Sequence, residues 1–162
     1  MPTRGIPKPT VDPPPWLTKD GIDLSLYPID NVLKQALSVN DEEFRTACSL
    51  LKSMCSAGRV EAGVFLLGLL KRYPDNYARL TLIADSLASF PRMETVDAFA
   101  GELRRVRGSS STRAYLRRVI EALERFPREL AGEEMQKLAS DPLVGTRFRQ
   151  RIRSLTGDYY FE

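Results

Sequence analysis

The 162-residue sequence contains no histidine, only two cysteines and one tryptophan, and no apolar run long enough to cross a membrane. Without histidine the chain lacks the commonest general base and metal ligand, and all His-containing catalytic triads are excluded. Catalysis is therefore disfavoured, and we expect neither a metal nor a cofactor. The longest apolar run, residues 64–70, is interrupted by Gly68, so we expect no membrane association.

The two cysteines, Cys48 and Cys55, lie on one predicted helix. At a rise of 1.5 Å per residue their Cα atoms are about 10 Å apart, which exceeds the reach of a disulfide. We therefore expect two reduced, largely buried thiols. Reduced thiols, together with a proline-rich N-terminal region in place of the apolar core of a secretory signal, indicate a cytoplasmic protein.

Charge is nearly balanced over the whole chain, with 24 Lys+Arg against 21 Asp+Glu, but the basic excess is C-terminal. Residues 101–162 carry 13 basic and 9 acidic side chains, whereas residues 1–100 carry 11 and 12. Of the 24 cations 18 are arginine, whose planar guanidinium can bind carboxylate or phosphate in a bidentate way. Codon bias would give the same ratio of arginine to lysine.

Five apolar positions recur twice at a spacing of 36 residues. Their offsets of 0, +3, +4, +7 and +10 put them on one stripe of a helix, so three helices should share a buried face. The five columns are Phe44/Leu80/Leu116, Ala47/Ile83/Val119, Cys48/Ala84/Ile120, Leu51/Leu87/Leu123 and Met54/Phe90/Phe126.

The helices between these three show a second set of columns at the same spacing, so the second member of each hairpin also repeats. These columns are Val60/Val96, Val64/Ala100, Leu67/Leu103 and Leu70/Val106. Residues 59–73 are apolar nearly all round, which is typical of a helix in the middle of a molecule. The isolated glycines within helices, Gly63, Gly68 and Gly101, are expected to let helices approach closely.

The chain divides into three parts. Residues 1–28 hold seven of the 11 prolines and predict an extended, proline-rich arm. Residues 29–157 form a helical-repeat domain, and residues 158–162 form an aromatic C-terminal tail. The predicted fold is all-α, a right-handed α–α superhelix of about four helical hairpins that follows the extended N-terminal arm.

An arginine lies near the start of each alternate helix, and successive arginines are 34 residues apart: Arg45, Arg79, Arg113 and Arg147. Three of these arginines follow an aspartate in the preceding turn, namely Asp41, Asp75 and Asp141. With this pattern residues 29–155 resemble the HEAT family of helical-hairpin repeats. The resemblance implies that these arginines are structural and form Asp–Arg ladders between repeats. Residues 58–62 and 73–76 are also similar to tetratricopeptide repeats, which is the alternative family.

The Arg-rich second half is the main candidate for a binding surface. We expect a non-catalytic protein-interaction module, an adaptor, scaffold or chaperone-like protein, in which Arg113, Arg117, Arg147 and Arg151 bind a segment of another, acidic protein. The alternative function is a nucleic-acid-binding helical-repeat protein that uses the same arginines. A solvated face without a partner is the third interpretation of the same residues.

Three aromatic residues are further candidates for contact with a partner. Trp16 follows three consecutive prolines and would either anchor a partner or cover the open end of the first hairpin. Tyr159 and Tyr160, in the tail, would either pack on the last hairpin or act as a short linear motif. The sequence leaves these alternatives open, as well as the oligomeric state.

Overall fold

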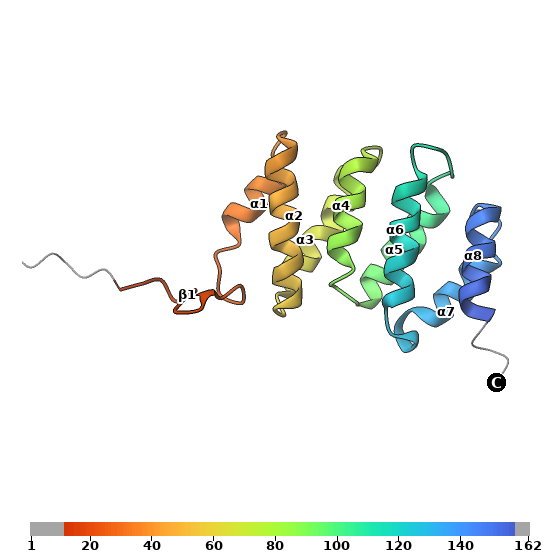
Figure 1. The fold of residues 1–162 in the computed structure, drawn as a ribbon. Coiled ribbons are helices and arrows are strands. Elements are labelled where there is room, and N and C mark those ends of the chain that lie inside the picture. Colours follow the sequence, from red (N-terminus) through yellow and green to blue (C-terminus); the bar gives the residue numbers. More distant parts are fainter. Residues whose placement is uncertain (1–11, 158–162) are drawn as a thin grey trace, which may run out of the picture.

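The structure is a computed structural model that describes residues 12–157, and helices dominate it, as the all-α prediction requires (Figure 1). Within this range there are eight helices and one short antiparallel hairpin. The helices are α1 (Asp30–Ala36), α2 (Asp41–Ser56), α3 (Val60–Arg72), α4 (Tyr77–Leu87), α5 (Met93–Arg105), α6 (Arg113–Arg125), α7 (Arg128–Ala139) and α8 (Thr146–Gly157). The hairpin pairs β1 (Leu17–Thr18) with β2 (Gly21–Ile22).

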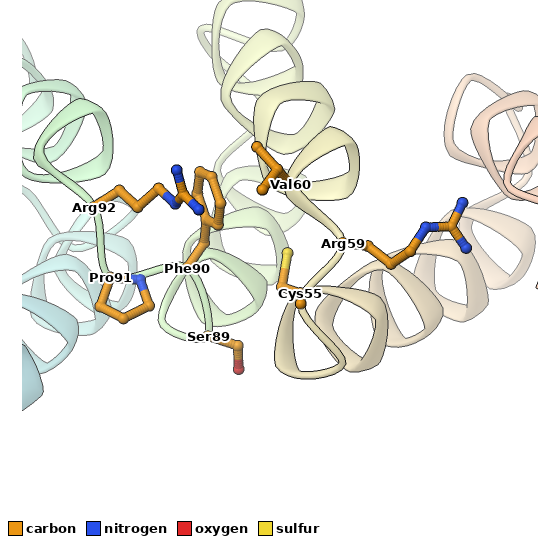
Figure 2. Close-up of a pocket in the computed structure, with 8 residues that line it drawn as sticks. Cys55, Arg59, Val60, Ser89, Phe90, Pro91 and Arg92 are labelled. Carbon is orange, nitrogen blue, oxygen red and sulfur yellow. The ribbon is translucent and has the colours of Figure 1, made fainter. Parts of the chain in front are cut away.

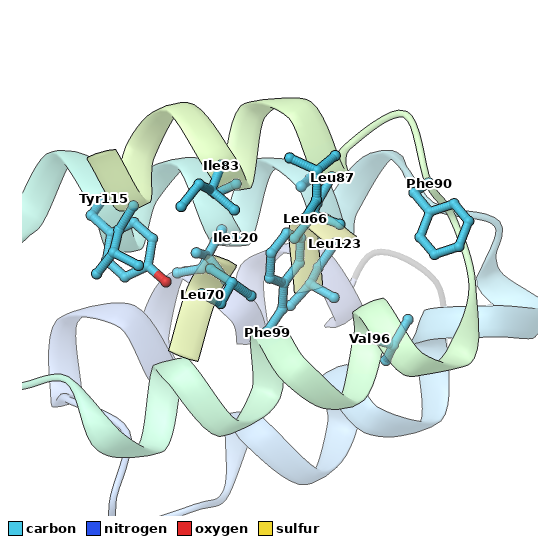
Figure 3. Packing of buried hydrophobic residues seen from close by; sticks show 14 of the residues in the cluster. Leu66, Leu70, Ile83, Leu87, Phe90, Val96, Phe99, Tyr115, Ile120 and Leu123 are labelled. Atoms are coloured by element: carbon cyan, nitrogen blue, oxygen red, sulfur yellow. The ribbon is translucent and has the colours of Figure 1, made fainter. Parts of the chain in front are cut away.

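Helices α2, α4 and α6 lie side by side and run in the same direction, and α8 continues the row (Figure 1). All fifteen positions of the first column set are buried, and the most exposed of them, Phe90 and Phe126, are only 6% accessible. The prediction of three helices with a common buried face is confirmed. The side chains of α3 and α5 complete this core, where Leu66, Leu70 and Phe99 meet residues of α4 and α6 (Figure 3).

Local signals in the sequence set the ends of these helices. The Asn40 side chain accepts hydrogen bonds from the backbone N–H groups of Glu42 and Glu43, which fixes the start of α2, and Asn76 caps α4 in the same way. Beyond the end of α2, Gly58 adopts a φ of +89°, a left-handed conformation that favours glycine and turns the chain into α3.

The first two columns of the second set do not correspond to a common environment. Val60 and Val64 are 40% and 59% exposed, although their expected counterparts Val96 and Ala100 are fully buried. Helix α4 has 11 residues where α2 has 16, so α5 begins 33 residues after α3 instead of 36. In this register Val60 matches Met93, which is also exposed. Helix α3 therefore has an outer, exposed face, and is not enclosed in the middle of the molecule.

The N-terminal region combines two short extended strands with turns. Within residues 12–28 the chain forms the β1–β2 hairpin and then returns to the helices. Arg59, at the start of α3, donates hydrogen bonds to the carbonyl oxygens of Leu24 (3.2 Å) and Tyr27 (2.7 Å). The Arg59 guanidinium is also paired with Glu61. This arginine holds the end of the arm against the first helical hairpin.

Candidate functional site

A ladder of ion pairs runs across the outer face of the even-numbered helices. Asp85 of α4 contacts Lys52 of α2 at 3.3 Å and Arg118 of α6 at 3.6 Å. Arg118 also lies 3.8 Å from Glu121 on its own helix, and Glu121 lies 3.9 Å from Arg151 of α8. The ladder therefore links all four helices of the row. We missed it in the sequence, although Lys52, Asp85, Arg118 and Arg151 follow one another at intervals of 33 residues.

The ladder changes the role expected of Arg151. Its side chain is 35% exposed and lies beside the Glu121 carboxylate, so part of its charge is already neutralised within the chain. The same holds for Arg118 between Asp85 and Glu121. The middle of the even-helix face is thus close to neutral, which the count of arginines alone did not indicate.

Two further arginines of the Arg-rich second half, Arg104 and Arg105, also make ion pairs within the chain. Arg104 contacts Glu134 of α7 at 2.9 Å and Asp141 in the α7–α8 turn at 2.6 Å. The hydrogen bond from Arg104 lowers the pKa of the Asp141 carboxyl below its ordinary value. Arg105 is paired with Glu102 at 2.7 Å on the same helix. Arg104 therefore joins α5 to α7 and the α7–α8 turn, and the charge of Arg105 is paired within α5.

The remaining predicted arginines, Arg113, Arg117 and Arg147, are exposed. None of them makes an ion pair with another residue in the range 12–157. Helices α6 and α8 both begin at the upper edge in Figure 1, and neither carries an acidic residue in its first turn. A Cβ placed at Gly108, in the α5–α6 loop, would lie 3.6 Å from the Phe148 ring of α8. The structure thus brings the starts of these two helices to one basic edge.

Arg79 is the one arginine of the expected Asp–Arg ladder that has a structural role. Arg79 is only 6% exposed. Its guanidinium donates hydrogen bonds to the Asp41 carboxylate (3.0 Å and 3.2 Å) and to the Ser38 carbonyl (2.9 Å). These bonds join the start of α4 to the start of α2. Its guanidinium lies over the rings of Phe44 (4.3 Å) and Tyr73 (5.0 Å). A buried charge with this set of partners is well satisfied.

The other rungs of that ladder are not formed in the part of the chain that the structure describes. Arg45, like Arg113 and Arg147, is exposed and has no ion pair there. Asp141 is paired with Arg104 instead of an arginine at the start of a helix. The regular spacing of 34 therefore does not correspond to a regular contact, because each pairing depends on how neighbouring helices are offset.

Of the three aromatic candidates for partner contact, Trp16 lies within the described residues. Trp16 is half-buried and lies edge-on to Tyr27 with ring centroids 5.0 Å apart, and Tyr27 packs against the helical core. Trp16 is therefore connected to the first helices through Tyr27. Tyr159 and Tyr160 lie outside the described residues.

Neither cysteine is a candidate nucleophile. Cys48 and Cys55 are unpaired and buried, and burial raises the pKa of Cys48 to about 12 and that of Cys55 to about 11. A thiol with such a pKa is protonated at neutral pH and is a weak nucleophile. Among residues 12–157 no cluster of Cys, Asp and Glu side chains could hold a metal ion, and no helix is long and apolar enough to cross a membrane.

A groove of about 210 Å³ opens at the opposite edge, between the α2–α3 turn and the α4–α5 loop (Figure 2). Arg92 lies against the face of the Phe90 ring, with its guanidinium carbon 5.2 Å from the ring centroid. The groove is lined by Cys55, Gly58, Arg59, Val60, Ser89, Phe90, Pro91 and Arg92. The sequence does not predict this groove, because its walls come from the α2–α3 turn and the α4–α5 loop, which α3 and α4 separate in the chain.

Comparison with known proteins returned no match to a family model, to a curated protein or to a solved structure.

Proposed function

We propose that this chain is a non-catalytic protein-interaction module, built as a right-handed superhelix of HEAT-like hairpins, that binds an acidic segment of another protein. The observation that carries the proposal is the basic edge formed by Arg113, Arg117 and Arg147. These side chains are exposed and lack acidic partners within residues 12–157, whereas several neighbouring arginines are paired.

Electrostatics at the helix ends supports an acidic partner. The N-terminus of a helix carries a partial positive charge, so arginine in the first turn is unfavourable in the isolated protein. Arg113 and Arg147 nevertheless occupy the first turns of α6 and α8. Bound carboxylates would relieve this repulsion, and the charge would also accelerate encounter with the partner.

The same edge is less suited to nucleic acid. Exposed aromatic rings on which bases stack are typical of sites for single strands. The large apolar side chains that residues 12–157 expose are all aliphatic or methionine. The two unpaired cysteines support a reducing location such as the cytoplasm.

The test uses a labelled deca-glutamate peptide and a labelled oligonucleotide of equal charge, each titrated by fluorescence anisotropy at low salt. We expect the peptide to bind, and the triple variant Arg113→Glu/Arg117→Glu/Arg147→Glu to bind it at least about tenfold more weakly, since tenfold corresponds to only about 1.4 kcal/mol. Arg45→Glu is the matched control, because Arg45 is also exposed and without an ion pair in the described range.

Equal peptide affinity in the wild type and the triple variant would exclude the role of this edge. Tighter binding of the oligonucleotide, with an affinity that falls steeply as salt is added, would favour the alternative nucleic-acid function instead.

A further inference from the structure

The groove at the lower edge has both apolar and polar walls, and the described chain leaves it open. Phe90 and Cys55 form its floor, and Val60 and Pro91 stand at its rim (Figure 2). Three apolar side chains in the segments that form the groove are exposed, Val60 to 40%, Met93 to 52% and Val64 to 59%. Val60 and Val64 lie one turn apart on the outer face of α3.

Charge in the groove is of one sign. Its lining contains two arginines and no acidic residue. Arg59 is already engaged by Glu61 and by the carbonyl oxygens of the arm. Arg92 is exposed and rests on the Phe90 ring, and it makes no ion pair within residues 12–157. The groove therefore offers an apolar floor and one arginine that is available to a carboxylate.

A ligand that complements this surface carries large apolar or aromatic side chains next to acidic groups. A guanidinium that already lies on an aromatic ring can stack a second ring and bind a carboxylate at its edge. The chain itself contains such a segment, because residues 158–162 read Asp-Tyr-Tyr-Phe-Glu. This segment directly follows α8, whose C-terminal end lies at the same edge of the molecule as the groove (Figure 1).

Distance argues against binding within one chain. The groove lies at the end of α4, and α6 stands between α4 and α8 (Figure 1). Packed helix axes are about 8–10 Å apart, so two such steps take about 16–20 Å. Five extended residues span about 18 Å at most, which leaves none of the segment to occupy the groove. A second molecule has no such restriction.

We propose that the groove between the α2–α3 turn and the α4–α5 loop binds residues 158–162 of a second copy of this chain. The aromatic side chains cover Pro91 and Val60, and a carboxylate of Asp158 or Glu162 pairs with Arg92. Because tail and groove are different surfaces, the contact is heterologous and joins copies head to tail. It uses the edge opposite to the basic edge, so it goes beyond the proposed function.

The first experiment measures binding of a fluorescent peptide with the sequence of residues 157–162 to the full chain by anisotropy. We expect saturable binding that weakens at least about tenfold in Arg92→Glu and in Val60→Asp, both of which change exposed side chains. A peptide with alanine at the three aromatic positions should also bind at least about tenfold more weakly. Arg45→Glu is the control protein, since it changes an exposed arginine near the start of α2, at the opposite end of that helix from the groove, and should leave peptide affinity unaltered.

The second experiment follows the full chain by sedimentation velocity over a range of concentrations. We expect self-association that rises with concentration and that is lost both in Arg92→Glu and when residues 158–162 are deleted. Circular dichroism of each variant checks that the helices are retained.

The proposal is overturned if the peptide fails to bind, if its affinity is the same in Arg92→Glu, or if the full chain stays monomeric at all concentrations. A tail that cross-links to the groove of its own chain, independently of concentration, would also overturn it. Each of these results leaves the basic edge and its acidic partner untouched, so failure here is distinguishable from failure of the proposed function.

Discussion

Gly63 shows how a single position limits the packing of two hairpins. A Cβ added there would lie 2.5 Å from ring carbons of Phe90, a distance at which something must move. Phe90 is itself confined, because it is 6% exposed and Arg92 rests on its ring. We expect Gly63→Ala to lower the free energy of unfolding by about 1–3 kcal/mol, the usual range for overpacking, as measured by chemical denaturation.

Gly68 and Gly101 serve as matched controls for this prediction. All three glycines lie within helices and were expected to allow close approach, but nothing lies within 4 Å of a Cβ placed at Gly68 or Gly101. Alanine at these two positions should be neutral or stabilising by up to about 1 kcal/mol, because alanine favours helix over glycine. A loss of stability in Gly68→Ala equal to that in Gly63→Ala would refute the explanation by contact with Phe90.

Thr95 illustrates a second effect at the scale of one residue. It is completely buried in the first turn of α5, and its Oγ1 has no hydrogen-bond partner. Such an unsatisfied group costs about 1–3 kcal/mol, so the nearly isosteric Thr95→Val should raise the free energy of unfolding by about 1 kcal/mol.

The control for Thr95 is Thr112, which is also buried but whose hydroxyl both donates and accepts a hydrogen bond. The Oγ1 of Thr112 donates to the Arg107 carbonyl at 2.7 Å and accepts from the Ser109 N–H at 2.9 Å. Thr112→Val should therefore destabilise the protein. Both variants would be compared by thermal and urea unfolding, and a destabilised Thr95→Val would show that its hydroxyl has a partner after all.

Helices in the even-numbered row are connected on their outer face by charge as well as in the core by apolar contact. Asp85 is central, since it pairs with α2 on one side and with α6 on the other. Its side chain is 43% exposed, so the pairs are screened by solvent and contribute less than the buried stripes do.

The ladder should therefore be weak and sensitive to salt. We expect Asp85→Asn to lower the free energy of unfolding by no more than about 1 kcal/mol at low salt, and by much less in about 1 M salt, where screening is nearly complete. Asp97→Asn is the control, because Asp97 is exposed and has no ion pair within residues 12–157. An effect of Asp85→Asn that persists in high salt would indicate a role other than ion pairing.

The molecule as a whole has two edges with different chemistry. Helices α6 and α8 begin at the basic edge, while α2 and α4 end beside the groove (Figure 1). A helix of 13 residues such as α6 is about 20 Å long, more than twice the screening length of about 8 Å at physiological ionic strength. We therefore expect Arg92→Glu to leave deca-glutamate affinity unchanged and the triple arginine variant to leave tail-peptide affinity unchanged, as measured in the same anisotropy assay.

The sequence by itself determined the three buried stripes of α2, α4 and α6, since helical periodicity is local and each stripe needs only its own side chains. It also determined the helix starts at Asn40 and Asn76, because a capping side chain acts on backbone groups two or three residues away.

Only the tertiary structure decided which arginines are available to a partner. Arg104 and Arg118 look as free as Arg113 and Arg117 in the sequence, but Glu134, Asp141 and Asp85, which pair with them, come from other parts of the chain. The exposure of Val60 and Val64 was decided in the same way. The early end of α4 sets the register between α3 and α5, and a local pattern within α3 holds no information about it.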